Sequence, residues 1–226
     1  MRRTIQLAVA STAVLIAAGQ VHATINFTGG TAHMAGGSTG VTNNWKDFSN
    51  VVYYEQDGYR FDFAGNTSAQ YVGTYYEGTN DVLHAHFGRI PLKEIRVSKI
   101  DGSAFDLVSL VVISNVQKNF SATGLEQTFL NASHDGTTIG ASYRLPSENW
   151  GPDSVKLVTP GASFTNLKFF NITTSNYVTS VGIDDVTVHD AVASVPEPIS
   201  LAVWGSFGVV GMAVGAVRRR RVRRSA

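Results

Sequence analysis

The chain of 226 residues contains no cysteine. Disulfide bonds and thiol nucleophiles are therefore excluded, and stability must come from a core, with or without a bound ion. No segment of twelve or more residues in the part between the two chain ends places apolar side chains at helical spacing. These absences favour a β-rich body that is held together by packing.

Several enzyme motifs are also missing. The sequence has no H-E-x-x-H zinc motif, no P-loop and no G-x-G-x-x-G dinucleotide motif. A glycosidase needs two carboxylates at a set separation across a cleft, and nothing in the sequence singles out such a pair. We therefore expect a protein that is not an enzyme.

The C-terminal segment combines three features in a fixed order. The motif Val195-Pro196-Glu197-Pro198 precedes an uncharged apolar run of 19 residues, Ile199–Val217. A helix of that length reaches about 28 Å, close to the hydrocarbon thickness of a bilayer, so the run predicts a transmembrane helix. Six arginines follow it, and by the positive-inside rule they act as a stop-transfer signal that leaves the body outside the cytoplasm. These arginines are Arg218, Arg219, Arg220, Arg221, Arg223 and Arg224.

This tail, residues 195–226, resembles the PEP-CTERM sorting signal. The resemblance implies that an exosortase, a membrane transpeptidase-like enzyme of Gram-negative bacteria that usually make exopolysaccharide, recognises the motif 195–198. The span 199–217 and the basic end 218–226 would be removed during sorting. The two prolines keep the motif extended outside the membrane, where a protease-like cleft can bind it. A nucleic-acid or nuclear-targeting patch is the alternative reading of the arginines, but their place directly after a span favours an anchor.

Residues 1–23 have the organisation of a secretory signal peptide. Arg2 and Arg3 supply the positive start, Leu7–Ala18 supply the apolar region, and Val21-His22-Ala23 places small residues at cleavage spacing. We expect an N-terminal signal helix with cleavage after Ala23, and an uncleaved anchor is the alternative. The chain is thus predicted to be a precursor that is exported through the inner membrane.

The remaining residues, 24–194, suit one domain. Without Arg2, Arg3, the six tail arginines and Glu197, this body holds ten basic and sixteen acidic residues, a formal net charge of −6. The whole-chain charge of +1 hides this acidity. An acidic body argues against nucleic-acid partners.

Short segments rich in Val, Ile, Phe, Tyr and Thr alternate with turn signals such as Asp57-Gly58 and Asp101-Gly102. They predict an all-β fold, a two-sheet jelly-roll-like sandwich. Phe105–Asn115 is apolar on both faces, which predicts an interior strand, while the Gly/Thr/Asn-rich residues 29–44 predict a loop with little core. The other expected strands are Ile25–Phe27, Val51–Tyr54, Tyr59–Phe63, Val82–Phe87, Glu94–Ile100, Gln127–Asn131, Thr137–Leu145, Ser154–Thr159, Phe164–Ile172 and Ser180–His189.

Three segments, Val51–Tyr59, Lys99–Leu107 and Gly182–Val188, look like exported bacterial jelly-roll domains that are similar to carbohydrate-binding modules. In the last of them, Ile183 and Val186 are expected to be core residues, which breaks the strand alternation at Asp184-Asp185 as a β-bulge does. The resemblance implies a structural calcium near Asp184 and Asp185, since hard oxygen ligands suit that ion. Glu55 and Asp57 are guesses for further ligands, and a hydrogen-bonded or solvated acidic pair is the alternative.

Two further groups have a structural and a binding interpretation. His84 and His86 share one strand face, about 7 Å apart, where they are expected to be structural rather than ligands of a transition metal. Aromatic side chains could stack on sugar rings, although such side chains more often belong to the core. These are Trp45, Trp150, Tyr53, Tyr54, Tyr71, Tyr75 and Tyr76.

Together these features predict a cell-surface or extracellular-matrix protein whose body is a structural or glycan-binding module associated with exopolysaccharide. An exported hydrolase that acts on polysaccharide is the alternative. An exosortase and the membrane are the expected partners.

Overall fold

The computed structural model describes residues 22–43, 48–65, 70–73, 81–85, 87, 92–117, 121–149, 155–175 and 180–191. These residues are all-β and form two antiparallel sheets. A single 3₁₀ turn, η1 (Ala162–Phe164), is the one helical element that they contain. No helix among them has the length and apolar character needed to cross a membrane. The expected signal helix and the expected span 199–217 lie outside the described residues.

Sheet A has seven strands in the order β13-β10-β15-β8-β7-β4, with β1 also paired to β15. Its strands are β1 (His22–Ile25), β4 (Phe48–Ser49), β7 (Gln70–Gly73), β8 (Val82–Ala85), β10 (Phe105–Val116), β13 (Lys156–Val158) and β15 (Ser180–Asp190).

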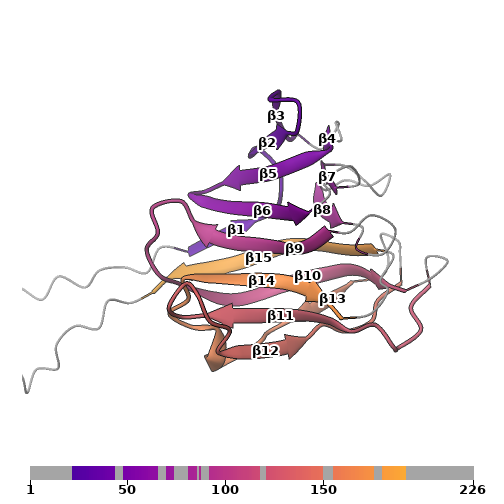
Figure 1. Cartoon of the computed structure of the whole chain (residues 1–226), viewed down its shortest axis with the longest axis vertical. Helices are drawn as coiled ribbons and strands as arrows, with labels where there is room; N and C mark the ends of the chain where they lie inside the picture. The colour runs from indigo at the N-terminus through magenta and orange to yellow at the C-terminus, as the bar shows by residue number, and fades with distance from the viewer. Residues whose placement is uncertain are drawn as a thin grey trace, which may run out of the picture.

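Sheet B has eight strands in the order β12-β11-β14-β9-β6-β5-β2-β3 and forms the front layer in Figure 1. Its strands are β2 (Thr31–Met34), β3 (Thr39–Val41), β5 (Val51–Gln56), β6 (Tyr59–Gly65), β9 (Leu92–Lys99), β11 (Thr128–Ser133), β12 (Ala141–Arg144) and β14 (Phe169–Thr174).

The core lies between the two sheets and follows from strand alternation. In β6, Tyr59, Phe61 and Phe63 are buried, while Arg60 and Asp62 face outward. The Phe105 ring of sheet A lies 5.3 Å from the ring of Tyr59 and 6.2 Å from that of Phe170, both in sheet B. Phe105 therefore joins the two layers from the start of β10.

The prediction of an interior strand at 105–115 is confirmed. β10 lies between β13 and β15, and its last five residues, Val112–Val116, are all buried. A strand that is covered on both faces needs apolar or fully hydrogen-bonded side chains in both directions, which explains why its sequence shows no simple alternation.

The prediction that residues 29–44 form a loop with little core is wrong. They form a hairpin, β2 and β3, in which Ala32 is fully buried. Glycine is needed here because a Cβ on Gly40 would lie 2.1 Å from the ring of Phe48. Gly40, one of the residues that suggested a loop, is thus small because a ring of the opposite sheet packs on it.

Other boundaries also differ from the predictions. β1 begins at His22, upstream of the expected cleavage point, and the positive φ of Phe27 (58°) follows its end. β14 begins at Phe169 rather than Phe164, because Phe164 belongs to η1. The short strands β4 and β7 were not predicted.

Candidate functional sites on the two sheet faces

β15 contains the bulge that the sequence predicted. Val111 pairs with Asp184 and Ser109 with Thr187, so β15 carries one extra residue between these pairs. Asp185 lies in this bulge, and its backbone is left-handed, with a φ of 44°. Ile183 and Val186 are both fully buried, as expected.

The bulge places the carboxylate of Asp184 where water hardly reaches it. Its exposed fraction is 5%. This burial is the main cause that raises the pKa of Asp184 to about 7, and the charges of Asp185 and Asp81 add to it. A hydrogen bond of 2.7 Å from the backbone N–H of Asp185 acts in the opposite direction.

The second carboxylate of this site, Asp81, was not predicted. Asp81 is fully buried directly before β8, and its Oδ2 accepts a 2.9 Å hydrogen bond from the hydroxyl of Thr28. β1 and β8 pair with successive stretches of the same edge of β15, so Thr28 and Asp81 meet where one strand ends and the next begins. We call Asp184, Asp81 and Thr28 the bulge site.

The ligands guessed from the sequence lie elsewhere. Glu55 is on the outer face of sheet B, where it contacts His33 at 3.4 Å and Arg60 at 3.9 Å. Asp57 occupies the turn between β5 and β6, with a φ of 51°. The second carboxylate of the bulge site is instead Asp81, from the segment directly before β8.

The bulge site fits a hard cation in the type of its donors. Its two carboxylates and one hydroxyl offer only oxygen, the ligand atom that Ca²⁺ prefers, and Asp184 and Asp81 would hold the ion. Within the described ranges, no group of three or more His, Cys, Asp or Glu side chains could hold a metal. Backbone oxygens and water would have to complete the shell.

The free energy of unfolding of the wild type is expected to fall as the pH rises, because the buried Asp184 must ionise. Replacing Asp184 by asparagine is expected to remove this fall. The unfolded chain ionises Asp184 near its ordinary pKa of 3.8, but the folded chain ionises it near 7. The folded state holds the extra proton between these values, so the free energy of unfolding of the wild type falls as the pH rises through that range. Asparagine cannot ionise, and it keeps an oxygen that can accept the Asp185 N–H. The difference in the free energy of unfolding between the variant and the wild type should therefore be about 4 kcal/mol more favourable to the variant at pH 8 than at pH 4, measured by urea unfolding without calcium.

The matched control is Asp185→Asn. Its side chain is exposed, and asparagine tolerates a left-handed backbone. This variant should therefore keep most of the pH dependence of the wild type, reduced only by the part that the charge of Asp185 contributes to the pKa of Asp184. A constant difference between Asp184→Asn and the wild type from pH 4 to pH 8 would contradict the burial of an ionisable carboxylate. If calcium binds at the bulge site, adding it at pH 8 should stabilise the wild type and not Asp184→Asn.

The outer face of sheet B carries a second arrangement, which joins seven strands. One polar or aromatic side chain from each strand stands opposite the next in register, in a continuous line across the sheet. At the spacing of β-strands the line spans about 29 Å. We call it the polar row, and its members in order are His33, Tyr53, Asp62, Arg96, Asn171, Asn131 and Ser142.

One half of the polar row is built on charge and aromatic rings. The His33 ring stacks on Tyr53 with centroids 4.0 Å apart, and the Arg60 guanidinium lies 3.8 Å from the Tyr53 centroid. Arg60 also contacts Asp62 at 2.6 Å. These contacts hold the rings and the charged groups in one geometry. Arg60 and Asp62 still have exposed fractions of 39% and 37%, so a ligand can reach them.

The other half is built on amides. Asn131 donates to Asn171 at 2.9 Å, Asn171 donates to Glu94 at 2.7 Å, and Ser142 donates to Asn131 at 2.7 Å. Arg96 joins the halves, because it contacts Glu94 at 3.2 Å and its guanidinium lies 4.2 Å from the Phe169 ring. These contacts pre-organise donors and acceptors along a flat face.

The aromatic side chains named from the sequence do not form an open stacking platform in the described part of the chain. The Tyr53 ring is in contact with both His33 and Arg60. Tyr54 is fully buried, its hydroxyl donates to Gln56 at 2.8 Å, and burial raises its pKa. Trp45, Trp150, Tyr75 and Tyr76 lie outside the described residues, and Tyr71 is described only as part of β7.

The structural interpretation of His84 agrees with its position. His84 is fully buried, and its Nε2 is hydrogen-bonded to the hydroxyl of Ser180. Leu83 and Ala85 point to the core on the opposite face, as the alternation predicted. His86 lies outside the described residues.

One spacing in the sequence could suggest a serine nucleophile. Gly36-Gly37-Ser38-Thr39-Gly40 has the order G-x-S-x-G, which in hydrolases forms a strand-to-helix turn. Here it spans the turn of the β2–β3 hairpin, where the N–H of Met34 donates to the carbonyl of Ser38. The motif is therefore a hairpin turn and not a nucleophile elbow.

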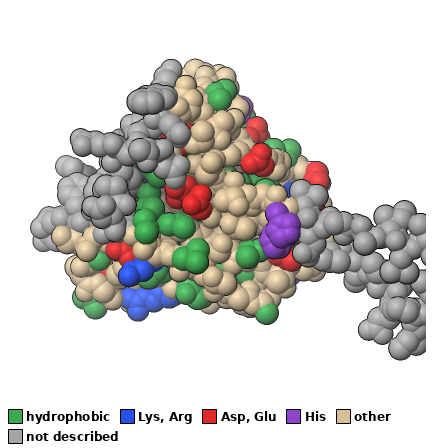
Figure 2. Space-filling view, turned by 180° about the vertical axis from the view of Figure 1, so that it is seen from behind, with side chains coloured by type: hydrophobic (Ala, Val, Ile, Leu, Met, Phe, Trp, Pro, Cys, Tyr) green, Lys and Arg blue, Asp and Glu red, His purple; other side chains and the backbone are tan. Residues whose placement is uncertain are grey.

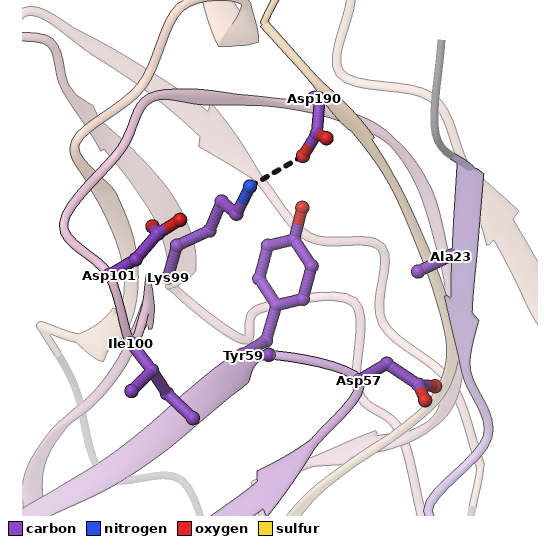
Figure 3. A pocket seen from close by; sticks show the side chains of 8 residues that line it. Ala23, Asp57, Tyr59, Lys99, Ile100, Asp101 and Asp190 are labelled. Atoms are coloured by element: carbon purple, nitrogen blue, oxygen red, sulfur yellow. Dashed lines mark hydrogen bonds and ion pairs between the residues drawn. The ribbon is translucent and has the colours of Figure 1, made fainter. Parts of the chain in front are cut away.

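A pocket of about 380 Å³ lies beside the start of β1 and the end of β15. Figure 3 shows Lys99 reaching across it to Asp190, with Tyr59 beside them, and the ion pair measures 2.5 Å. Asp57 and Asp101 also line the pocket. The pair links sheet B to sheet A across the pocket.

The sorting motif Val195–Pro198 and the arginines of 218–224 lie outside the described residues. Comparison of the sequence with protein-family models and with curated proteins finds no match.

Proposed function

We propose that the body is a glycan-binding module of the cell surface or extracellular matrix, and that the polar row binds the polysaccharide. The observation that carries this proposal is the register itself, which aligns seven side chains over about 29 Å across sheet B. Such a line matches an extended polymer chain better than a compact ligand.

The chemistry of the polar row suits hydroxyl-rich ligands. A sugar hydroxyl both donates and accepts, and the row alternates donors such as Arg96 with acceptors such as Asp62. Mutual contacts hold these groups in place, so binding a glycan would order few additional side chains. Because Arg60 and Arg96 are each paired with carboxylates, the row presents no strong field of one sign.

The alternative function, a polysaccharide hydrolase, has one observation in its favour. Asp184 and Asp81 are neighbouring carboxylates, and a raised pKa is a property of a general acid. Their exposed fractions are only 5% and 0%, and the described pocket is lined by other residues. A carboxylate pair that no substrate reaches favours a structural role, so we propose that the protein is not an enzyme.

Arg96→Ala is expected to weaken binding of the host's exopolysaccharide at least about tenfold, which corresponds to about 1.4 kcal/mol. Arg96 has an exposed fraction of 42% and lies at the middle of the polar row, so its loss removes charge-assisted hydrogen bonds to the glycan. The measurement is titration calorimetry of the mature protein with purified polysaccharide.

Lys156→Gln is the control for this experiment. Lys156 is a 60% exposed cation on β13 of sheet A, whereas the polar row lies on sheet B. Lys156→Gln should leave the affinity unchanged, and both variants should remain folded at the temperature of the titration. Equal affinity of Arg96→Ala and the wild type would contradict the proposed surface.

We further propose that the sandwich is jelly-roll-like. From β8 to β11 and from β12 to β15, successive strands alternate between sheet A and sheet B. This pattern of crossing between layers is typical of jelly rolls, and hairpin meanders would keep neighbours in one sheet.

We propose that the chain is exported and is sorted at its tail by an exosortase. The tail sequence supports sorting, and the fold supports a body that is attached at one end. His22 pairs with His189, so the start of β1 and the end of β15 lie side by side (Figure 1). The eight residues 191–198, fully extended, would span about 26 Å. An N-terminal signal segment and a C-terminal span could thus enter the membrane from the same end of the sandwich.

A further inference from the structure

The outer face of sheet A carries a pair of histidines that none of the functions above uses. His22 on β1 and His189 on β15 are register partners, and their ring centroids lie 3.7 Å apart. Figure 2 shows histidine side chains gathered at one edge of this face. The alternation in β1 and β15 turns Ile25, Val186 and Val188 into the core, which leaves both histidines on the solvent side.

We propose that His22 and His189 form a two-imidazole site for a divalent transition metal such as Cu²⁺, Ni²⁺ or Zn²⁺. Imidazole is a preferred ligand of these ions. Two nitrogens that bind one metal at about 2.1 Å each lie roughly 3 Å apart. Rings that already touch reach this separation by small side-chain rotations, because they stand on directly paired strands.

The surroundings of the pair favour a cation. Asp106 of β10 pairs with His189 from the other side, so His22, His189 and Asp106 follow one another across three strands. The Oδ1 atom of Asp106 accepts a 2.7 Å hydrogen bond from the backbone N–H of Asn166, which holds this carboxylate in place. The next pair on the same face, Thr24 and Thr187, adds hydroxyls and no positive charge.

This site would depend on processing of the chain. Cleavage after Ala23, as expected from the sequence, removes His22 and leaves His189 alone. The metal site therefore belongs to the chain that retains its N-terminal segment, and the processed protein serves as a natural deletion control.

The test uses the full chain in detergent, produced without export so that residues 1–22 remain, and Cu²⁺ as the probe. Electron paramagnetic resonance should show one Cu²⁺ bound by two imidazole nitrogens. His22→Gln and His189→Gln should each leave one nitrogen and raise the Kd at least about tenfold. His134→Gln, a change at an exposed histidine in a loop, should alter neither the spectrum nor the Kd.

The two variants lie on different strands, so a folding defect in one leaves the other as a test. A chain that begins at Thr24 exposes a new α-amino group, which is itself a Cu²⁺ ligand, so the spectrum is its readout and the two-imidazole signal should be absent. A wild-type spectrum in His22→Gln, in His189→Gln or in the chain that begins at Thr24 would overturn the site.

Discussion

Replacing Pro196, Glu197 and Pro198 together by alanine is expected to leave every chain uncut in the native host. The two prolines fix φ and keep the preceding residues out of the helical region. Alanine has the highest helix propensity, so the variant would let the expected helix of 199–217 extend backward through the motif. The extended segment that a cleft can bind would be lost together with its one charge.

The measurement is the intact mass of the protein from strains with and without the exosortase. The wild type should lose residues 199–226 only in the strain that has the enzyme, and the triple variant should keep them in both. Val192→Ala with Ser194→Ala, in the linker before the motif, is the control and should be processed normally. A wild-type chain that retains Arg218–Arg224 in both strains would mean that the tail is a plain membrane anchor.

Phe105→Ala is expected to cost about 3–5 kcal/mol of the free energy of unfolding. Phe105 is fully buried and contacts Tyr59 and Phe170 of the opposite sheet. Removing its ring leaves a cavity between the layers, which the strands cannot close because each is fixed by its neighbours. Since the chain has no disulfide bond, this loss is a large fraction of the stability expected for a domain.

The matched control for this variant is Phe129→Ala. Phe129 lies on β11 of sheet B with its side chain only partly buried, so the same chemical change should cost about 1 kcal/mol or less. Urea unfolding measures both. Equal losses in the two variants would contradict the role of the Phe105 ring as a buried contact between the two sheets.

The sequence predicted those features that depend on neighbouring residues. The two apolar faces of 105–115 identified an interior strand, and the spacing of Ile183 and Val186 identified the bulge. Both can be recognised because the buried face of a strand sets the spacing of its apolar residues over a few neighbouring positions. The same strand alternation placed Leu83 and Ala85 on one face of their strand and His84 on the other.

Features that depend on pairing between distant segments could not be predicted. The polar row brings together His33 and Ser142, which are more than a hundred positions apart in the chain, through six successive strand registers. Asp81 reaches Asp184 only because β1 ends where β8 begins along β15. The β2–β3 hairpin was missed because Gly40, which has no space for a Cβ beside Phe48, resembles a loop residue in the sequence.

We propose above all that the exopolysaccharide lies along the outer face of sheet B. The most direct test is a nuclear magnetic resonance titration of the mature protein with the host's polysaccharide, following side-chain resonances. We expect the resonances of the Asn131 and Asn171 amides and of the Arg60 and Arg96 guanidinium groups to shift together, while that of Lys99 in the pocket does not. Shifts confined to the pocket or to sheet A, or no shifts at all, would contradict it.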